Sequence, residues 1–275
     1  MVASLLALLI AAPAPACPPA ALRAARFAPG EQLRFRLDAL GADVGSFEVS
    51  VEVPQGADRA RGALVLRSRA KTSAFVTTNL GRYEAFVAAL VGPDLAAVRY
   101  REEIDEGDLH RSQEVEFPAR AGKLHVDATK DGRPEPLDLD AGPGAREMLS
   151  ALYLLRALPL RTGQPVCAEV YAARKMWRLE GAVGPREQIE GPLGRFPAVR
   201  VDLTAARADD ASVKRSAHVW LTDDERRLPL AMVGDVKGKT IRAQLIEATG
   251  AGLKTASTKP ERKTGAPRVG AAIGR

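Results

Sequence analysis

The chain has 275 residues, 46% of them hydrophobic, which is ordinary for a soluble globular protein and allows one large β domain or two small ones. Six Lys and Arg residues against one Glu in residues 250–275 account for +5 of the net charge of +6, so the rest of the chain carries only +1. Nucleic-acid-binding proteins gather basic residues on a folded face with aromatics between them, whereas this tail is rich in Gly, Ala, Thr and Pro, so we expect no nucleic-acid partner and a disordered basic tail over 250–275.

The first sixteen residues, 1–16, are typical of a secretory signal peptide. They contain no charged side chain, and the apolar run Leu5–Ala12 is followed by the small-x-small pattern Ala14–Ala16, although the usual Lys or Arg near the start is absent. This run is too short to span a bilayer, and no later segment is long and apolar enough to do so. We therefore expect a periplasmic protein without a transmembrane span, in which residues 17–26 form a flexible N-terminal segment.

The two cysteines, Cys17 and Cys167, leave three alternatives open. Cleavage after Ala16 would make Cys17 the first mature residue, so it could be acylated and anchor the protein to the outer membrane. Lipoprotein signals usually have Leu three positions before this Cys, where the chain has Ala14. In an oxidising compartment Cys17 could instead pair with Cys167, which would stabilise the fold by about 3–5 kcal/mol. In the third alternative, Cys17 lies in a removed or disordered part and Cys167 is a small buried hydrophobic residue.

Residues 27–249 predict a single antiparallel β domain. The segments 31–37 and 47–53 alternate apolar and polar side chains with period two, which indicates half-buried strands. Further strands are expected at 63–70, 83–90, 95–103, 112–117, 123–130, 165–171, 176–183, 187–191, 199–204, 216–221, 228–236 and 240–248. Gly-containing links such as 105–108 and 130–133 read as hairpin turns, so consecutive strands form a meander.

One segment in this domain, 145–158, predicts a helix. Its apolar residues cover nearly the whole circumference, so the helix must be enclosed on all sides. The sequence Gly142–Gly144 before it and Pro159 after it limit its length. Since only sheet is available to enclose it, we expect a mainly β fold in which a large curved antiparallel sheet, an open half-barrel, wraps one central α-helix.

Four segments give the chain a resemblance to a known family. They are FAPGEQLRFRL (27–37), REMLSALYLLRALPLRTGQPV (146–166), EGPLGRFPAVRV (190–201) and HVWLTDDERRLPLAM (218–232). Together they resemble the exported bacterial family known as domain of unknown function 3108, over about residues 27–248. The resemblance implies a periplasmic protein with a curved sheet around a helix, similar to the half-barrels of periplasmic lipoprotein carriers. It implies no activity, and no motif matches the lipid-contacting residues of those carriers.

Candidate residues for catalysis or metal binding are few. His110, His125 and His218 fall singly in three expected strands, without the short spacing or Cys companions of a metal site. Ser112 and Ser216 each lie two residues from a His on one strand face, but no Gly-x-Ser-x-Gly elbow is present. We therefore expect no metal, no cofactor and no enzymatic activity.

Two polar turns could be mistaken for catalytic or phosphate-binding motifs. Asp223 and Asp224 follow an expected strand and precede Arg226 and Arg227, so a charge-paired turn is expected rather than an acid/base pair. The segment 191–196 lacks the following helix and Lys of a phosphate-binding loop, and a hairpin is expected there.

The expected helix carries the main functional hypothesis. An open half-barrel would leave an apolar cavity between the sheet and Leu149, Leu152, Tyr153 and Leu155, where a lipid or a lipoprotein acyl chain could bind. Otherwise side chains fill this space and the helix is a core element. Arg156 could extend to the mouth and meet a lipid headgroup, or complement the dipole at the helix C-terminus.

Two functions follow from these alternatives. The first is a non-enzymatic cell-envelope protein that binds a hydrophobic ligand or takes part in outer-membrane biogenesis. The second is a structural or interaction scaffold with a packed, ligand-free interior. Such a scaffold would offer its sheet edges and basic tail to an envelope protein or an anionic surface.

Overall fold

The computed structural model describes residues 17–23, 27–236 and 238–250. The expected signal peptide, 1–16, and the basic tail from residue 251 onward lie outside the described residues. None of the helices among the described residues is long and apolar enough to cross a membrane.

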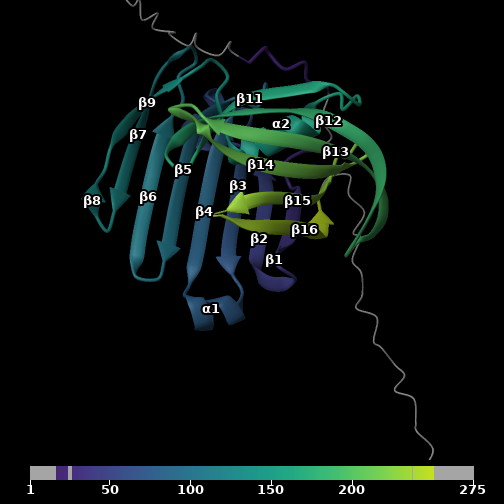
Figure 1. The fold of residues 1–275 in the computed structure, drawn as a ribbon. Coiled ribbons are helices and arrows are strands. Elements are labelled where there is room, and N and C mark those ends of the chain that lie inside the picture. The colour runs from purple at the N-terminus through teal and green to yellow at the C-terminus, as the bar shows by residue number, and fades with distance from the viewer. Residues whose placement is uncertain (1–16, 24–26, 237, 251–275) are drawn as a thin grey trace, which may run out of the picture.

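The described residues form a mainly β structure built on one sheet of sixteen strands (Figure 1). The strands are β1 (Gln32–Ala39), β2 (Ala42–Glu52), β3 (Leu64–Thr72), β4 (Tyr83–Val91), β5 (Ala97–Glu106), β6 (Leu109–Glu116), β7 (Gly122–Lys130), β8 (Arg133–Pro134), β9 (Leu137–Ala141), β10 (Arg146–Glu147), β11 (Pro165–Ala172), β12 (Lys175–Gly191), β13 (Gly194–Arg207), β14 (Asp210–Thr222), β15 (Pro229–Val236) and β16 (Lys239–Thr249). Every strand predicted from period-two alternation overlaps one of these.

The sheet consists of two meanders that meet at its centre. The first runs from β1 to β8, with β9 also paired to β7, and the second runs from β10 to β16. Strands β1 and β16 join them by antiparallel pairing, with Leu33 opposite Ala248. The pairs are antiparallel except for β10 with β11. The expected antiparallel meander is therefore present, within a sheet that stays open.

The two outer ends of the sheet approach each other without forming a ladder. Strand β9 lies in contact with β12, and Arg174 in the β11–β12 turn donates to the Glu135 carboxylate at 2.6 Å. The Glu169 carboxylate accepts from the backbone N–H of Gly142 at 2.8 Å. Side chains rather than strand pairing thus bridge the gap in this barrel-like sheet.

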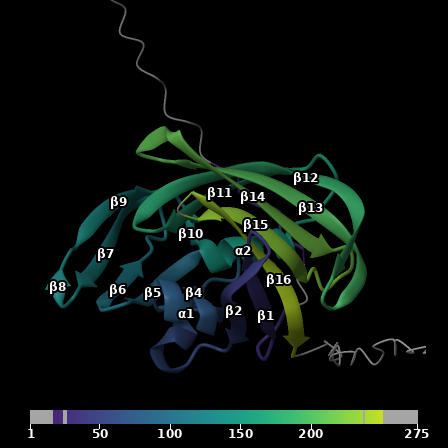
Figure 2. The same ribbon diagram turned by 60° about the horizontal axis from the view of Figure 1, so that its bottom comes forward.

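Helix α2 (Met148–Ala157) lies between the two meanders (Figures 1 and 2) and contacts β3 and β4 as well as β10 and β11. Nine of its ten residues are buried, and Met148 is 61% exposed. The burial predicted from its all-round apolar surface is confirmed. Its helical span is shorter than the expected 145–158, because residues 146–147 form the short strand β10 instead.

The expectation of one helix is wrong, because the described residues also contain α1 (Ala74–Leu80) and the 3₁₀ helix η1 (Gly56–Ala60). Helix α1 connects β3 to β4, and none of its residues is buried. Ser73 caps it by accepting from the backbone N–H of Val76 at 3.3 Å. Its sequence contains three β-branched residues, which favour strands, so the sequence pattern does not predict a helix here.

Two hydrophobic clusters fill the space around α2. One contains inward-facing residues of β1–β7 together with Leu149 and Tyr153 of the helix. The other contains residues of β11–β14 together with Leu152, Leu154 and Leu155. The first cluster also includes residues of the second meander, such as Tyr171 of β11 and Leu245 of β16, so both meanders pack together around α2.

Residues 17–23, which belong to the segment 17–26 that the sequence predicts to be flexible, are tied to this core. Cys17 forms a disulfide with Cys167 of β11, with 5.4 Å between their Cα atoms. Leu22 packs against both clusters, and the backbone N–H of Arg23 donates to the carbonyl of Ala157, the last residue of α2, at 2.8 Å. Of the three alternatives for the cysteines, the structure contains the disulfide.

Candidate functional site

A buried carboxylate fixes the start of α2. Glu147 accepts hydrogen bonds from the backbone N–H groups of Leu149 and Ser150, both at 2.6 Å. The Ser150 hydroxyl accepts from the backbone N–H of Glu147 at 3.1 Å, which completes a capping box. Burial raises the pKa of the Glu147 carboxyl to about 7, although the two backbone hydrogen bonds favour its ionised form. The helix therefore begins at a group that titrates near neutral pH inside the protein.

A buried ion pair fixes the other end of α2. Arg156, 2% exposed, donates to both carboxylate oxygens of Glu31, at 2.6 and 2.8 Å. It also donates to the backbone carbonyls of Arg226 and Arg227, which lie between β14 and β15. The Tyr153 hydroxyl donates to the same Glu31 carboxylate at 2.8 Å. Burial alone would lower the pKa of Arg156, but the hydrogen bonds and charge of Glu31 outweigh it and raise that pKa.

This geometry does not place Arg156 at an exposed mouth, whereas its position in the last turn of α2 is the one expected for complementing the helix dipole. Its guanidinium does not reach an exposed mouth, because its donors are directed to Glu31 and to the β14–β15 turn. The terminal carbonyl of α2, on Ala157, accepts from Arg23 instead. Arg156 links the helix to both meanders, and its cationic head is enclosed rather than available to a lipid headgroup.

The other four residues expected to bind a ligand are core residues. Leu149, Leu152, Tyr153 and Leu155 are 5%, 8%, 0% and 3% exposed, and they divide between the two clusters on either side of α2. The structure therefore brings these residues together on one helix but not around a common space. Packing of this kind is what the alternative of a filled interior requires.

Each histidine pairs with an aspartate on the facing strand. The Nδ1 atom of His110 lies 2.8 Å from the Asp105 carboxylate, and that of His125 lies 2.7 Å from the Asp138 carboxylate. The Nδ1 atom of His218 lies 2.6 Å from the Asp202 carboxylate. Hydrogen bonding to Asp105 raises the pKa of His110, and hydrogen bonding to Asp138 raises that of His125. Within the described part of the chain, no group of three or more His, Cys, Asp or Glu could hold a metal ion.

The two serines near histidines have other partners. The Ser112 hydroxyl lies 2.8 Å from the Thr129 hydroxyl, and the Ser216 hydroxyl lies 3.5 Å from the Asp235 carboxylate. These contacts are cross-strand polar pairs on the sheet surface. They do not form the serine–histidine contact that a nucleophile needs.

The two polar turns have the expected structural roles. Asp224 accepts from the Thr222 hydroxyl at 2.7 Å and from the backbone N–H of Arg226 at 2.9 Å, while Asp223 pairs with Arg186 at 2.7 Å. The segment 191–196 forms the hairpin between β12 and β13. Both predictions are confirmed.

A hollow of about 620 Å³ lies on the sheet face opposite α2, across β16 and β1–β5. Successive side chains of a strand point to opposite faces of the sheet. Leu33 and Val49 point into the core, so the side chains that line the hollow come from the opposite, polar face of each strand. Those side chains are Gln32, Arg34, Glu48, Ser50, Arg67, Arg69, Phe86, Ala88, Arg101, Glu103, Glu247 and Thr249. A second hollow, of about 550 Å³, lies where α1 meets β2 and β3. No residue of α2 lines either hollow.

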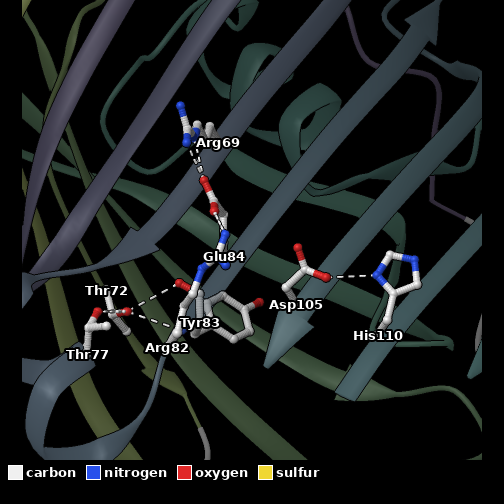
Figure 3. A network of polar contacts seen from close by, with 8 residues as sticks. All are labelled: Arg69, Thr72, Thr77, Arg82, Tyr83, Glu84, Asp105 and His110. Atoms are coloured by element: carbon white, nitrogen blue, oxygen red, sulfur yellow. Dashed lines mark hydrogen bonds and ion pairs between the residues drawn. The ribbon is translucent and has the colours of Figure 1, made fainter. Parts of the chain in front are cut away.

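Cross-strand ion pairs organise the polar face. Glu84 is held between Arg69 and Arg82, which lies 2.6 Å away (Figure 3), and hydrogen bonds from Arg82 and then Arg69 lower its pKa. The Arg69 guanidinium also lies 5.0 Å from the ring centre of Phe86, which is 40% exposed. The face therefore presents charges of both signs beside an aromatic ring, which suits a polar partner rather than an acyl chain.

Sequence reasoning missed the partner of Arg156 and the hollow. Glu31 lies 125 residues from Arg156 and was assigned only to a strand end. For the hollow a signal did exist, because the polar positions of the alternating strands 31–37 and 47–53 are the ones that line it. Whether this polar face is flat or hollow depends on the tertiary structure, which alternation does not predict.

Comparisons with known proteins agree with this architecture. A family model described as "Protein of unknown function (DUF3108)" matches residues 33–245. No protein with a curated description matches the sequence. A beta-barrel-like protein of domain of unknown function DUF1849 from Brucella abortus is similar in structure, with a TM-score of 0.52 and 11% identity over 82% of this chain and 98% of its own. At that identity the likeness shows the fold alone.

Two further solved structures are more distant. A protein from Bacteroides fragilis, described as exported and having a YmcC-like fold, is 7% identical over 81% of this chain and 96% of its own, with a TM-score of 0.30. A protein from Parabacteroides distasonis described as a lipoprotein has the same identity and coverage, with a TM-score of 0.32. These two scores are too low to support an argument about the fold.

Proposed function

This chain belongs to the DUF3108 family, proteins of unknown function, and we propose that it is a non-catalytic periplasmic scaffold of the cell envelope with a packed interior. One observation carries the proposal: the α2 residues that would line an internal site are core residues, and Arg156 is paired with buried Glu31. Admitting an acyl chain would separate α2 from the sheet and pull Arg156 away from Glu31, and unpaired charges left in an apolar interior are strongly unfavourable. The scaffold alternative therefore has more support than an internal ligand.

The disulfide supports an extracytoplasmic location. Disulfides persist in oxidising compartments such as the periplasm and are rare in the cytosol. Because the Cys17 sulfur is bonded to Cys167, it is not free to carry a lipid in the same molecule. We accordingly place the protein in the periplasm, held by contacts with its partner rather than by acylated Cys17.

Native mass spectrometry of the protein exported from its own host tests this proposal. We expect the mass of a disulfide-bonded chain without acylation and without retained lipid. A fluorescent fatty acid should show no saturable binding, and Leu152→Trp, which would fill any internal cavity, should change nothing in this assay. A retained lipid that disappears in Leu152→Trp would favour the internal ligand instead.

The 620 Å³ hollow is the surface that we assign to a polar partner of the scaffold. Photo-crosslinking from Ala88, inside the hollow, should yield a salt-sensitive adduct with an envelope protein. The matched control places the crosslinker at Arg133, which is also exposed but lies on β8, away from the hollow. Equal adducts from both positions would mean that the hollow is not the contact surface.

A further inference from the structure

Three large apolar side chains are exposed at one end of the sheet, and we call them the apolar tip. Leu40, in the β1–β2 turn, is 102% exposed, and Phe75 and Leu80, in α1, are 67% and 81% exposed. The turn and the helix lie at the same end of the molecule in both views (Figures 1 and 2). The Ser73 hydroxyl joins them by donating to the carbonyl of Asp43, near the start of β2, at 3.0 Å.

The apolar tip contributes little to folding. A seven-residue helix without a buried residue lacks the packing that normally stabilises short helices in water. Leu40 has a φ of 52°, in the left-handed region that favours Gly or Asn, so the turn carries strain as well as an exposed leucine. Both features are unfavourable for an isolated protein in water, and both lie at the same place. An interaction that covers these side chains would compensate for them.

The charges around the apolar tip fit a bilayer surface. Residues 72–81, TSAFVTTNLG, contain no charged side chain, and the cations Lys71 and Arg82 lie immediately on either side of them. Lys71 is exposed, and the side chain of Arg82 is 60% exposed although it pairs with Glu84. Apolar side chains at the headgroup boundary with flanking cations that reach the phosphates are typical of interfacial segments.

Two nearby carboxylates are already engaged in turns. Asp38 accepts from the backbone N–H of Gly41 at 3.1 Å, and Asp43 accepts from that of Gly45 at 3.0 Å. These hydrogen bonds hold the β1–β2 turn and reduce the need of both carboxylates for water. Leu40 is therefore exposed in a turn whose carboxylates, Asp38 and Asp43, are hydrogen-bonded to nearby backbone groups.

Several polar groups of the uncharged segment also have partners nearby. The Thr72 hydroxyl lies 2.8 Å from the Thr77 hydroxyl and accepts from the backbone N–H of Tyr83 at 3.1 Å (Figure 3). The Asn79 side chain donates to the carbonyl of Phe75 at 2.8 Å. A segment whose polar groups are paired internally enters a region of low dielectric constant at a smaller desolvation cost.

We propose that the apolar tip, Leu40 with Phe75 and Leu80, inserts into the surface of a phospholipid bilayer and docks the protein on an envelope membrane. The proposal rests on the proposed function in requiring export, but it does not depend on a packed interior. The lipid touches the outside of the protein at one end and is exchangeable. This distinguishes it from a lipid retained between α2 and the sheet.

Flotation of the disulfide-bonded chain with phosphatidylcholine vesicles tests the proposal. Zwitterionic vesicles are chosen because the basic tail 250–275 would bind anionic vesicles by itself. We expect the protein to float, and the triple variant Leu40→Ser/Phe75→Ser/Leu80→Ser, which retains the tail, to lose partitioning by on the order of tenfold or more. The matched control, Val53→Ser/Met148→Ser, removes residues that are 52% and 61% exposed elsewhere and should float like the natural protein.

A spectroscopic variant keeps the test decisive if the triple variant fails to fold. Phe75→Trp should show a blue-shifted emission with vesicles and quenching by brominated lipids, whereas Val53→Trp should show neither.

Two results would overturn the inference. In the first, neither the natural chain floats nor Phe75→Trp emission shifts. In the second, sedimentation velocity shows a dimer that the triple variant converts to a monomer, so that the apolar tip is a contact between copies. Neither result bears on the proposed packed interior, because native mass spectrometry measures retained lipid independently.

Discussion

The two α-helices both carry large apolar side chains, but their surroundings are opposite. In α2, nine of ten residues are buried, and even the charged ends, Glu147 and Arg156, have partners inside the protein. In α1 no residue is buried. The comparison teaches that apolar content alone does not define the core, since the apolar side chains of one helix are buried and those of the other are exposed at the surface. Substitutions in the two helices should therefore separate stability from binding.

The largest expected effect comes from Glu31→Ala, which leaves the Arg156 charge buried without its partner. We expect the free energy of unfolding to fall by about 3–5 kcal/mol, measured by urea denaturation. The control is Glu48→Ala, whose ion pair with Arg34 is about half exposed and should contribute less than about 1 kcal/mol. Equal losses in the two variants would show that the buried pair does not hold α2 in place.

Truncation of one leucine in each helix sharpens the contrast. Leu154→Ala in α2, where the residue is 1% exposed, should cost about 2–5 kcal/mol because it leaves a cavity. Leu80→Ala in α1 should change stability by less than about 0.5 kcal/mol. A large loss in Leu80→Ala would mean that α1 supports the fold, which would contradict its assignment to a docking role.

The disulfide between Cys17 and Cys167, which ties residues 17–23 to β11, should contribute about 3–5 kcal/mol because it closes a long loop. Cys17→Ser/Cys167→Ser is expected to unfold at a correspondingly lower temperature in a calorimeter. Reductant should destabilise the natural protein to the same level and leave the double variant unchanged. If the reductant has no effect on the natural protein, the disulfide is not formed.

Glu147 makes stability depend on pH in a direction unusual for a carboxylate. Its folded pKa of about 7 exceeds its ordinary value of 4.5, so the folded state binds more protons between these values. The free energy of unfolding should therefore be highest below pH 4.5 with respect to this group and fall, by up to about 3 kcal/mol, as pH rises through 7. Glu147→Gln should flatten this dependence in urea denaturation at pH 5 and pH 8, and an unchanged slope would reject the assignment.

The exposed His–Asp pairs should give the smallest effect. Because the folded pKa values of His110 and His125 are raised, their contribution is complete below their ordinary pKa of 6.5 and is lost as pH rises through the raised values. Both pairs are exposed, so the change in stability should be slight. NMR titration should place both pKa values above 6.5, and Asp105→Asn should return that of His110 toward 6.5 without affecting His125.

Alternation along the strands predicted most of the fold because one face of each strand is buried. The expected strand 123–130 matches β7, whereas 176–183 and 187–191 proved to be one strand, β12. Gly184 and Pro185 interrupt its pattern and read as a turn, but the structure accommodates them as a register shift within the ladder. Short strands such as β8 and β10 carry too few residues to show a period.

The site was less predictable, because its parts come from distant segments. The helix containing Arg156 was expected, but Glu31 reaches it only once β1 lies at the centre of the sheet. A charged residue on an otherwise apolar helix indicates either an exposed end or a buried partner, and the sequence alone does not distinguish them. Periodicity identifies which face is polar, but not whether that face is flat or hollow.

The pairing of β1 with β16 has a consequence for how this protein is made. The first and last strands of the sheet are neighbours at its centre, so the central ladder forms only after nearly the whole chain has been synthesised. Such a topology has high contact order and is expected to fold slowly. Until then both strands have free edges that invite aggregation, so the newly synthesised chain should depend on chaperones during its maturation.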